Sequence, residues 1–139
     1  MSKSGPSAIM HTMQGKRLIN TILGLLVLQF ILGMLANLYA SIPEQRPYEV
    51  FHQFGYIFLH LLNGVALVVL GIILVQRSRR QGGLGWASAG LGNVLLAFMF
   101  GEIFVFTQND IFSLLMAVAF IGALLSYARI AFPATEAEK

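Results

Sequence analysis

Apolar residues fill four long stretches of this chain, and only short polar segments separate them. The stretches cover residues 18–40, 51–75, 84–106 and 111–131. A bilayer core of about 30 Å needs roughly 20 apolar residues of helix, so each stretch is about long enough to cross it. The pattern predicts an all-α fold, namely an integral membrane four-helix bundle.

The same pattern divides the chain into an N-terminal segment 1–17, a four-span domain 18–132 and a C-terminal tail 133–139. Only residues 107–109 connect the third and fourth spans, so we expect these two to form an antiparallel hairpin. Asn109 or Asp110 can cap the fourth helix by accepting hydrogen bonds from its first free backbone N–H groups.

Composition agrees with a membrane domain. Of the 139 residues, 57% are hydrophobic and 11% are charged, whereas a soluble domain carries roughly 25% charged residues. The absence of cysteine excludes disulfides, thiolate metal sites and cysteine nucleophiles. The net charge of +3 does not indicate nucleic acid, because the positions of the basic residues favour a membrane.

Basic residues are concentrated on one side of the spans. They are Lys3, Lys16 and Arg17 before the first span and Arg77, Arg79 and Arg80 after the second. The first connection, residues 41–50, holds Arg46 against Glu44 and Glu49. By the positive-inside rule, both termini and an Arg77–Arg80 loop lie in the cytoplasm, with the chain in the inner (cell) membrane. An anionic-lipid site is the alternative to a purely topological role for these arginines.

Small residues mark packing surfaces on the spans. The third span has one at every fourth position, interrupted by one amide: Gly85, Ala89, Asn93, Ala97 and Gly101. Such residues let membrane helices approach closely, so we expect helix association. Aromatic residues near span ends, Trp86 and Tyr127 among them, are expected at the membrane interface.

Three carboxamides occupy similar depths on three different spans. From the helical rise, Gln29, Asn63 and Asn93 all lie roughly 16–20 Å below the outer face. Gly122 of the fourth span reaches the same depth and can leave room for them. The three predict a hydrogen-bonded layer that holds helices in register. The alternative is a substrate or ion position at the midplane.

The second span carries the residues best able to bind a ligand or transfer a proton. His52, Tyr56, His60 and Asn63 fall within roughly 80° of one another on a helix. His60, about 13 Å deep, is a functional candidate by its position, and a neutral imidazole bonded inside the bundle is the structural alternative. His52 and His60 are about 12 Å apart along the axis, so they cannot share one metal. Haem b would need a second ligand, either Met99 at similar depth or His60 of a second protomer.

Glu102 is the one carboxylate well inside a span. Its depth matches Tyr56 and Asn37, which permits a polar cluster with His60 in the outer half. Asn93 and Glu102 are nine residues apart, about 180° around the helix, so both cannot face the same seam. Glu102 can instead face a second protomer or reach the headgroups.

No motif for nucleotide, phosphate or acyl chemistry is present, and no catalytic or metal site is predicted. Three functions stay open. The first is a non-enzymatic subunit that works in the lipid bilayer as a homo-oligomer or in a larger membrane complex. The second is a redox anchor that binds haem b or quinone through His60 and Tyr56. The third is proton or small-solute transport through His52, His60 and Glu102.

Three short segments resemble a known group of proteins. They are residues 37–43 (NLYASIP), His60 with Gly64 four residues on, and residues 109–117 (NDIFSLLMA). They are similar to segments in a group of small four-span bacterial membrane proteins to which no activity is assigned. The similarity covers roughly residues 18–131. It implies a bacterial cell membrane and four spans, and it transfers no catalytic residue.

Overall fold

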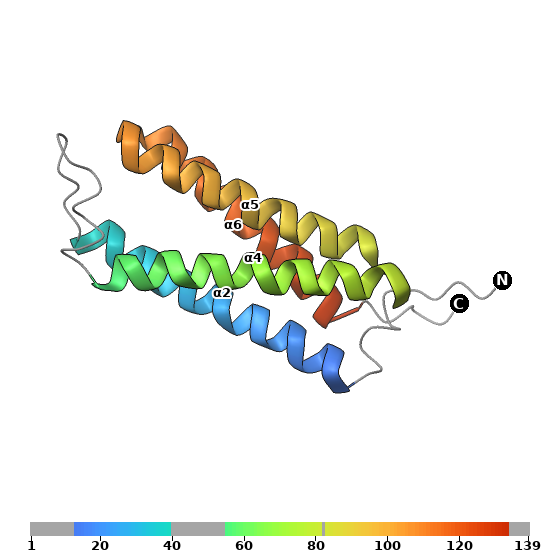
Figure 1. Cartoon of the computed structure of the whole chain (residues 1–139). Coiled ribbons are helices and arrows are strands. Elements are labelled where there is room, and N and C mark those ends of the chain that lie inside the picture. The colour runs from blue at the N-terminus through green and yellow to red at the C-terminus, as the bar shows by residue number, and fades with distance from the viewer. Residues whose placement is uncertain (1–12, 40–54, 82, 134–139) are drawn as a thin grey trace.

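Four long helices make up the described part of the chain (Figure 1). The computed structural model describes residues 13–39, 55–81 and 83–133. The helices are α2 (Met13–Tyr39), α4 (Gly55–Gln81), α5 (Leu84–Thr107) and α6 (Asp110–Ala131). Each is long and apolar enough to cross a membrane. The predicted all-α four-helix bundle is therefore confirmed at the level of its helices, and these suggest a multi-pass membrane protein.

Two helices extend further than the apolar stretches predicted. The first, α2, already begins at Met13, so Lys16 and Arg17 are helical. Helix α4 continues to Gln81, which corrects the predicted Arg77–Arg80 loop to the end of a helix. Cations are favourable there because the last backbone carbonyls of a helix are unpaired and carry partial negative charge. The predicted start of the second span, residues 51–54, lies outside the described residues.

The connection between α5 and α6 matches the predicted tight hairpin. Asn109 is the cap, and its Oδ1 accepts a hydrogen bond from the Ile111 backbone N–H at 3.0 Å. Gln108 takes a left-handed conformation (φ 53°), and its N–H donates to the Phe104 carbonyl at 2.8 Å. These local bonds satisfy free backbone groups at both helix ends, so the two residues Gln108 and Asn109 suffice to reverse the chain.

The core lies toward the end of the bundle where α2 begins and α4 and α6 end, which we call the basic end. Tyr127 of α6 is fully buried there, with Ile19, Ile22 and Leu74. Its ring fits between α4 and α5 because glycines face it. A Cβ on Gly90 would lie 2.6 Å from Tyr127 Cε1, and one on Gly71 would lie 2.9 Å from its hydroxyl oxygen. Tyr127 is thus a core residue, and its predicted interfacial role is wrong.

Toward the opposite end, which we call the far end, the α5–α6 hairpin inclines away from α2 and α4 (Figure 1). Aromatic rings connect helices in this part of the bundle. Phe30 of α2 stacks on Phe120 of α6 with ring centroids 6.1 Å apart. Phe100 and Phe112 pair across the hairpin at 6.3 Å.

Candidate polar site between α2 and α4

Gln29, His60 and Asn63 form one hydrogen-bonded network across the α2–α4 seam. The Asn63 Nδ2 atom donates to Gln29 Oε1 at 2.6 Å and to the Leu25 carbonyl at 2.9 Å. Gln29 Nε2 lies 3.1 Å from His60 Nε2. Asn63 is 7% exposed, so these bonds form where little water can replace them. The network joins α2 to α4 at the depth predicted for the carboxamides.

The direction of each bond in this network follows from a single carbonyl. The Leu25 carbonyl can only accept, so the Asn63 atom facing it must be the amide nitrogen. That nitrogen also faces Gln29, so Gln29 presents its oxygen to Asn63 and its NH₂ to His60. His60 Nε2 must then accept, which assigns a neutral imidazole with its proton on Nδ1.

The His60 ring lies against the backbone of α2. A Cβ on Gly33 would lie 3.2 Å from His60 Cε1 and 3.8 Å from Nδ1, so only glycine leaves the ring in place. His60 Nδ1 is buried and has no hydrogen-bond partner within residues 13–39, 55–81 and 83–133. Because Nδ1 carries the proton, the site holds one unsatisfied N–H donor beside α2.

Sequence reasoning had not assigned Leu25 and Gly33 to this site. Both lie four residues from Gln29, one on each side, and therefore on the same face of α2. That four-residue spacing is the feature of the sequence that could have placed Leu25 and Gly33 beside Gln29. A backbone carbonyl leaves no trace in residue identity, so the acceptor role of Leu25 becomes visible only with coordinates.

Asn93 is not part of the network. Its Nδ2 donates to the Ala89 carbonyl of its own helix at 2.9 Å. Its side chain packs on α6, where a Cβ on Gly122 would lie 2.5 Å from Asn93 Oδ1. The expected layer of three carboxamides therefore consists of two carboxamides and His60. Gly122 does provide room, but for Asn93 alone.

The other residues proposed for this site differ in their exposure, and one lies outside the described residues. Tyr56 and Glu102 are partly exposed, and Asn37 is exposed. Met99 is 46% exposed on α5, whereas its neighbour Phe98 packs against Gly64 of α4. His52 lies outside the described residues. Within the described ranges no hydrogen bond joins Asn37, Met99 or Glu102 to His60, and no three acidic or histidine side chains cluster as metal ligands would.

Two chemical capacities follow from this geometry. The network can hold α2 and α4 in register, because all three of its hydrogen bonds join one helix to the other. The His60 Nδ1 donor takes no part in it. His60 can also offer its Nδ1–H to an acceptor oxygen. Its Nε2 lone pair is engaged by Gln29, so ligation of haem iron through Nε2 would require Gln29 to move away.

Comparison with protein-family models, curated proteins and solved structures gives no match to this chain.

Proposed function

We propose that the chain is a non-enzymatic bacterial inner-membrane protein that works by helix association, with both termini in the cytoplasm. A second copy of the chain packs against α5. The observation that carries this proposal is an open notch of small residues on α5, which we call the α5 notch: Gly85, Ser88, Ala89 and Gly92.

The α5 notch faces outward. Gly85, Ser88 and Ala89 are exposed, and a Cβ built on Gly85 or Gly92 meets no atom within 4 Å. Gly90 of the same helix is packed tightly on Tyr127. Gly90 therefore already accommodates a side chain of the same bundle, whereas Gly85 and Gly92 leave open space on the outside. Small residues on an outward face let a second helix approach closely.

A second copy is the natural occupant because of symmetry. Copies inserted in the same orientation and related by a two-fold axis along the membrane normal present the same residues at the same depth. Gly85 and Gly92 would then meet their counterparts, so small residues face small residues. Ser88 can add an interhelical hydrogen bond at the same contact.

The polar network supports association as the function, because its amide groups already make hydrogen bonds within the fold. Gln29 and Asn63 satisfy each other and Leu25. A transport route or a catalytic centre would need polar groups directed at a path or a substrate. In the described residues these two amides instead join α2 to α4.

The test compares variants that fill the α5 notch with one that fills an equivalent gap elsewhere. Gly85→Leu/Gly92→Leu adds bulk where the fold has space, so the monomer should remain folded while the oligomer is lost. Gly24→Leu is the matched control, since a Cβ on Gly24 of α2 also meets nothing within 4 Å. Particle mass after purification in mild detergent is the measurement.

The proposal predicts an oligomer for the wild type and Gly24→Leu, and a monomer for the double variant. A wild-type particle that is strictly monomeric without a co-purifying protein would contradict association. A wild-type complex that the double variant leaves intact would place the contact away from α5.

A second candidate is favoured by the His60 Nδ1–H, which has no hydrogen-bond partner among the described residues. It fits a lipid-soluble ligand with an acceptor oxygen, such as a quinone, better than haem b, whose iron needs the lone pair that Gln29 occupies. Purified protein expressed with ample haem should then show no Soret band, while a quinone should bind wild type more tightly than His60→Leu. Equal quinone binding by the two proteins would eliminate this candidate.

A further inference from the structure

The ends of the described bundle differ completely in charge. Six basic residues lie at the basic end, on α2, α4 and α6: Lys16, Arg17, Arg77, Arg79, Arg80 and Arg129. The two described carboxylates, Glu102 and Asp110, lie toward the far end, where α5 ends and α6 begins. The described helices thus confine positive charge to one end without a neighbouring acid.

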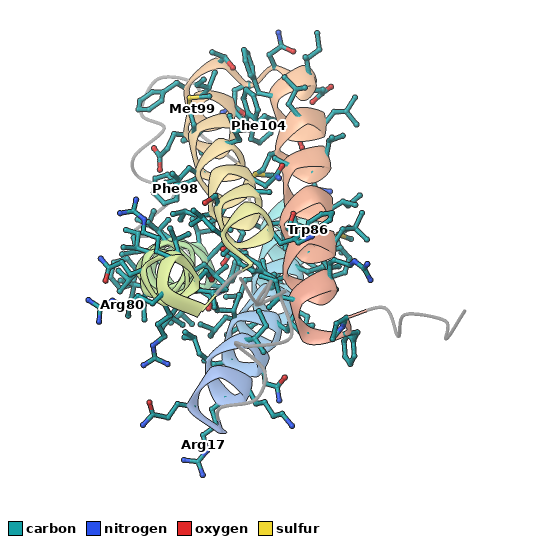
Figure 2. The ribbon with its side chains drawn as sticks, turned by 90° about the vertical axis from the view of Figure 1, so that its right-hand side faces the viewer. Arg17, Arg80, Trp86, Phe98, Met99 and Phe104 are labelled. Carbon is teal, nitrogen blue, oxygen red and sulfur yellow. The ribbon has the colours of Figure 1, made fainter. Side chains whose placement is uncertain are left out.

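These cations are available for an external partner. No ion pair joins any of them to a carboxylate in the part of the chain that the structure describes. Lys16, Arg17, Arg79, Arg80 and Arg129 are exposed, and Arg77 is half-buried. Figure 2 looks onto this end and shows Arg17 and Arg80 pointing outward at separate places on the rim. These two charges therefore lie apart and do not form one pocket.

The helices beneath this rim are the best packed part of the bundle. Ile19, Leu74 and Ile130 are fully buried within a few residues of the cations. The side chain of Ser78, between Arg77 and Arg79, is also buried and bonds to the Leu74 carbonyl at 2.8 Å. The arginine stems of α4 therefore project from a well-packed part of the helix.

We infer that the basic end binds the phosphate headgroups of anionic phospholipids as a belt around the bundle. This inference rests on the proposed membrane insertion. It goes beyond orientation, which needs only that basic residues remain on one side. Arginines that pair with no carboxylate of the described residues should, at headgroup level, enrich anionic lipid over zwitterionic lipid in the first shell.

Trp86 provides a natural probe of this shell. It is the only tryptophan of the chain, it lies in the first turn of α5, and it is 45% exposed. Its fluorescence can be quenched by phospholipids with brominated acyl chains in reconstituted vesicles. Comparing brominated phosphatidylglycerol with brominated phosphatidylcholine at equal mole fraction measures the lipid preference around Trp86, in the first turn of α5 at the basic end.

We expect phosphatidylglycerol to quench Trp86 preferentially in the wild type. Arg79→Gln/Arg80→Gln should reduce the preference by up to about fivefold for each arginine removed. Arg79→Lys/Arg80→Lys retains the charge and should retain most of the preference. Asp110→Asn, which removes a charge at the far end, should leave the preference unchanged.

Three results would overturn the inference. One is equal quenching by both lipids in the wild type, and another is an unchanged preference in the glutamine variant. The third is loss of the preference in inorganic phosphate but not in sodium chloride at equal ionic strength, which would indicate a free-phosphate site. If the proposed membrane insertion fails, the result is distinct, because Trp86 would then be quenched by neither lipid.

Discussion

At the scale of single residues, the hydrogen bond from Asn63 to the Leu25 carbonyl determines which ring nitrogen of His60 carries the proton. The Leu25 carbonyl orients Asn63, Asn63 orients Gln29, and Gln29 places its amide against His60 Nε2. Protonation of His60 on Nε2 would set two donors against each other. The network therefore favours neutral His60 and makes Asn63 its anchor.

Asn63→Ala should destabilise the protein more than Asn93→Ala. Asn63 makes two bonds to α2, and interhelical bonds in membranes average about 0.6 kcal/mol and reach about 1–2 kcal/mol. We expect a loss of about 1–2 kcal/mol for Asn63→Ala. Asn93 bonds only to its own helix, so its loss should be smaller. Unfolding in mixed detergent micelles measures both, and equal losses would contradict an anchoring role for Asn63.

Tyr127→Phe should leave stability unchanged or raise it by about 1 kcal/mol. The buried Tyr127 hydroxyl has no hydrogen-bond partner in the described residues, and an unsatisfied buried polar group costs about 1–3 kcal/mol. Phenylalanine keeps the ring contact with Gly90 and loses only the contact between the hydroxyl oxygen and Gly71. The same unfolding experiment applies, and a clear loss of stability would show that the hydroxyl has a partner.

The sequence predicts the depth of a residue better than the seam it faces. Counting along the helix placed Gln29 and Asn63 at one level, and they do meet. It placed Asn93 at that level too, yet Asn93 faces Gly122 of α6. Depth follows from helical rise alone, whereas the direction of a side chain relative to other helices depends on how the bundle packs. Tyr127 illustrates the same limit, because its position near a span end did not reveal two glycines making room for its ring.

At the scale of the element, α5 shows why a four-residue stripe does not mark a single surface. A helix turns about 100° per residue, so each step of four advances the stripe by about 40°. Gly85 and Ala89 therefore face outward, Asn93 faces Gly122, and a Cβ on Gly101 would lie 3.1 Å from Met116 Sδ of α6. One predicted surface is divided between the hairpin seam and the α5 notch.

Gly90→Ala and Gly92→Ala should have opposite effects although they lie two residues apart. Gly90→Ala places a Cβ against the Tyr127 ring and should cost about 1–3 kcal/mol through overpacking. Gly92→Ala meets no atom, and alanine favours a helix over glycine by about 0.5–1 kcal/mol. Thermal unfolding of the monomer in a dissociating detergent is the measurement. A similar loss for both variants would contradict the inward and outward assignment.

At the scale of the whole molecule, the four helices and the α5–α6 hairpin were predictable because bilayer length and turn chemistry leave few alternatives. The residues at which the helices begin and end were less predictable. Arginines at the end of α4 read as loop residues, since hydropathy falls there while the helix continues to Gln81. The outward α5 notch also needed coordinates, because the sequence does not show which small residues are already covered.

The proposed orientation predicts a specific labelling pattern in intact cells. The chain has no cysteine, so single cysteines report position without background. Gln108→Cys, in the α5–α6 connection, should react with a membrane-impermeant thiol reagent. Phe132→Cys, at the end of α6, should react only after permeabilisation. The reverse pattern would invert the topology, and labelling of both in intact cells would argue against insertion.

The central claim is that copies of the chain associate through the α5 notch, and disulfide cross-linking in native membranes tests it most directly. Ser88→Cys places a thiol in the α5 notch, and Leu125→Cys and Val27→Cys place one on α6 and α2 at outward positions that are 64% and 57% exposed. Mild oxidation should convert Ser88→Cys into a covalent dimer and leave both controls monomeric. Absence of the Ser88→Cys dimer, or equal dimer formation at all three positions, would contradict the claim.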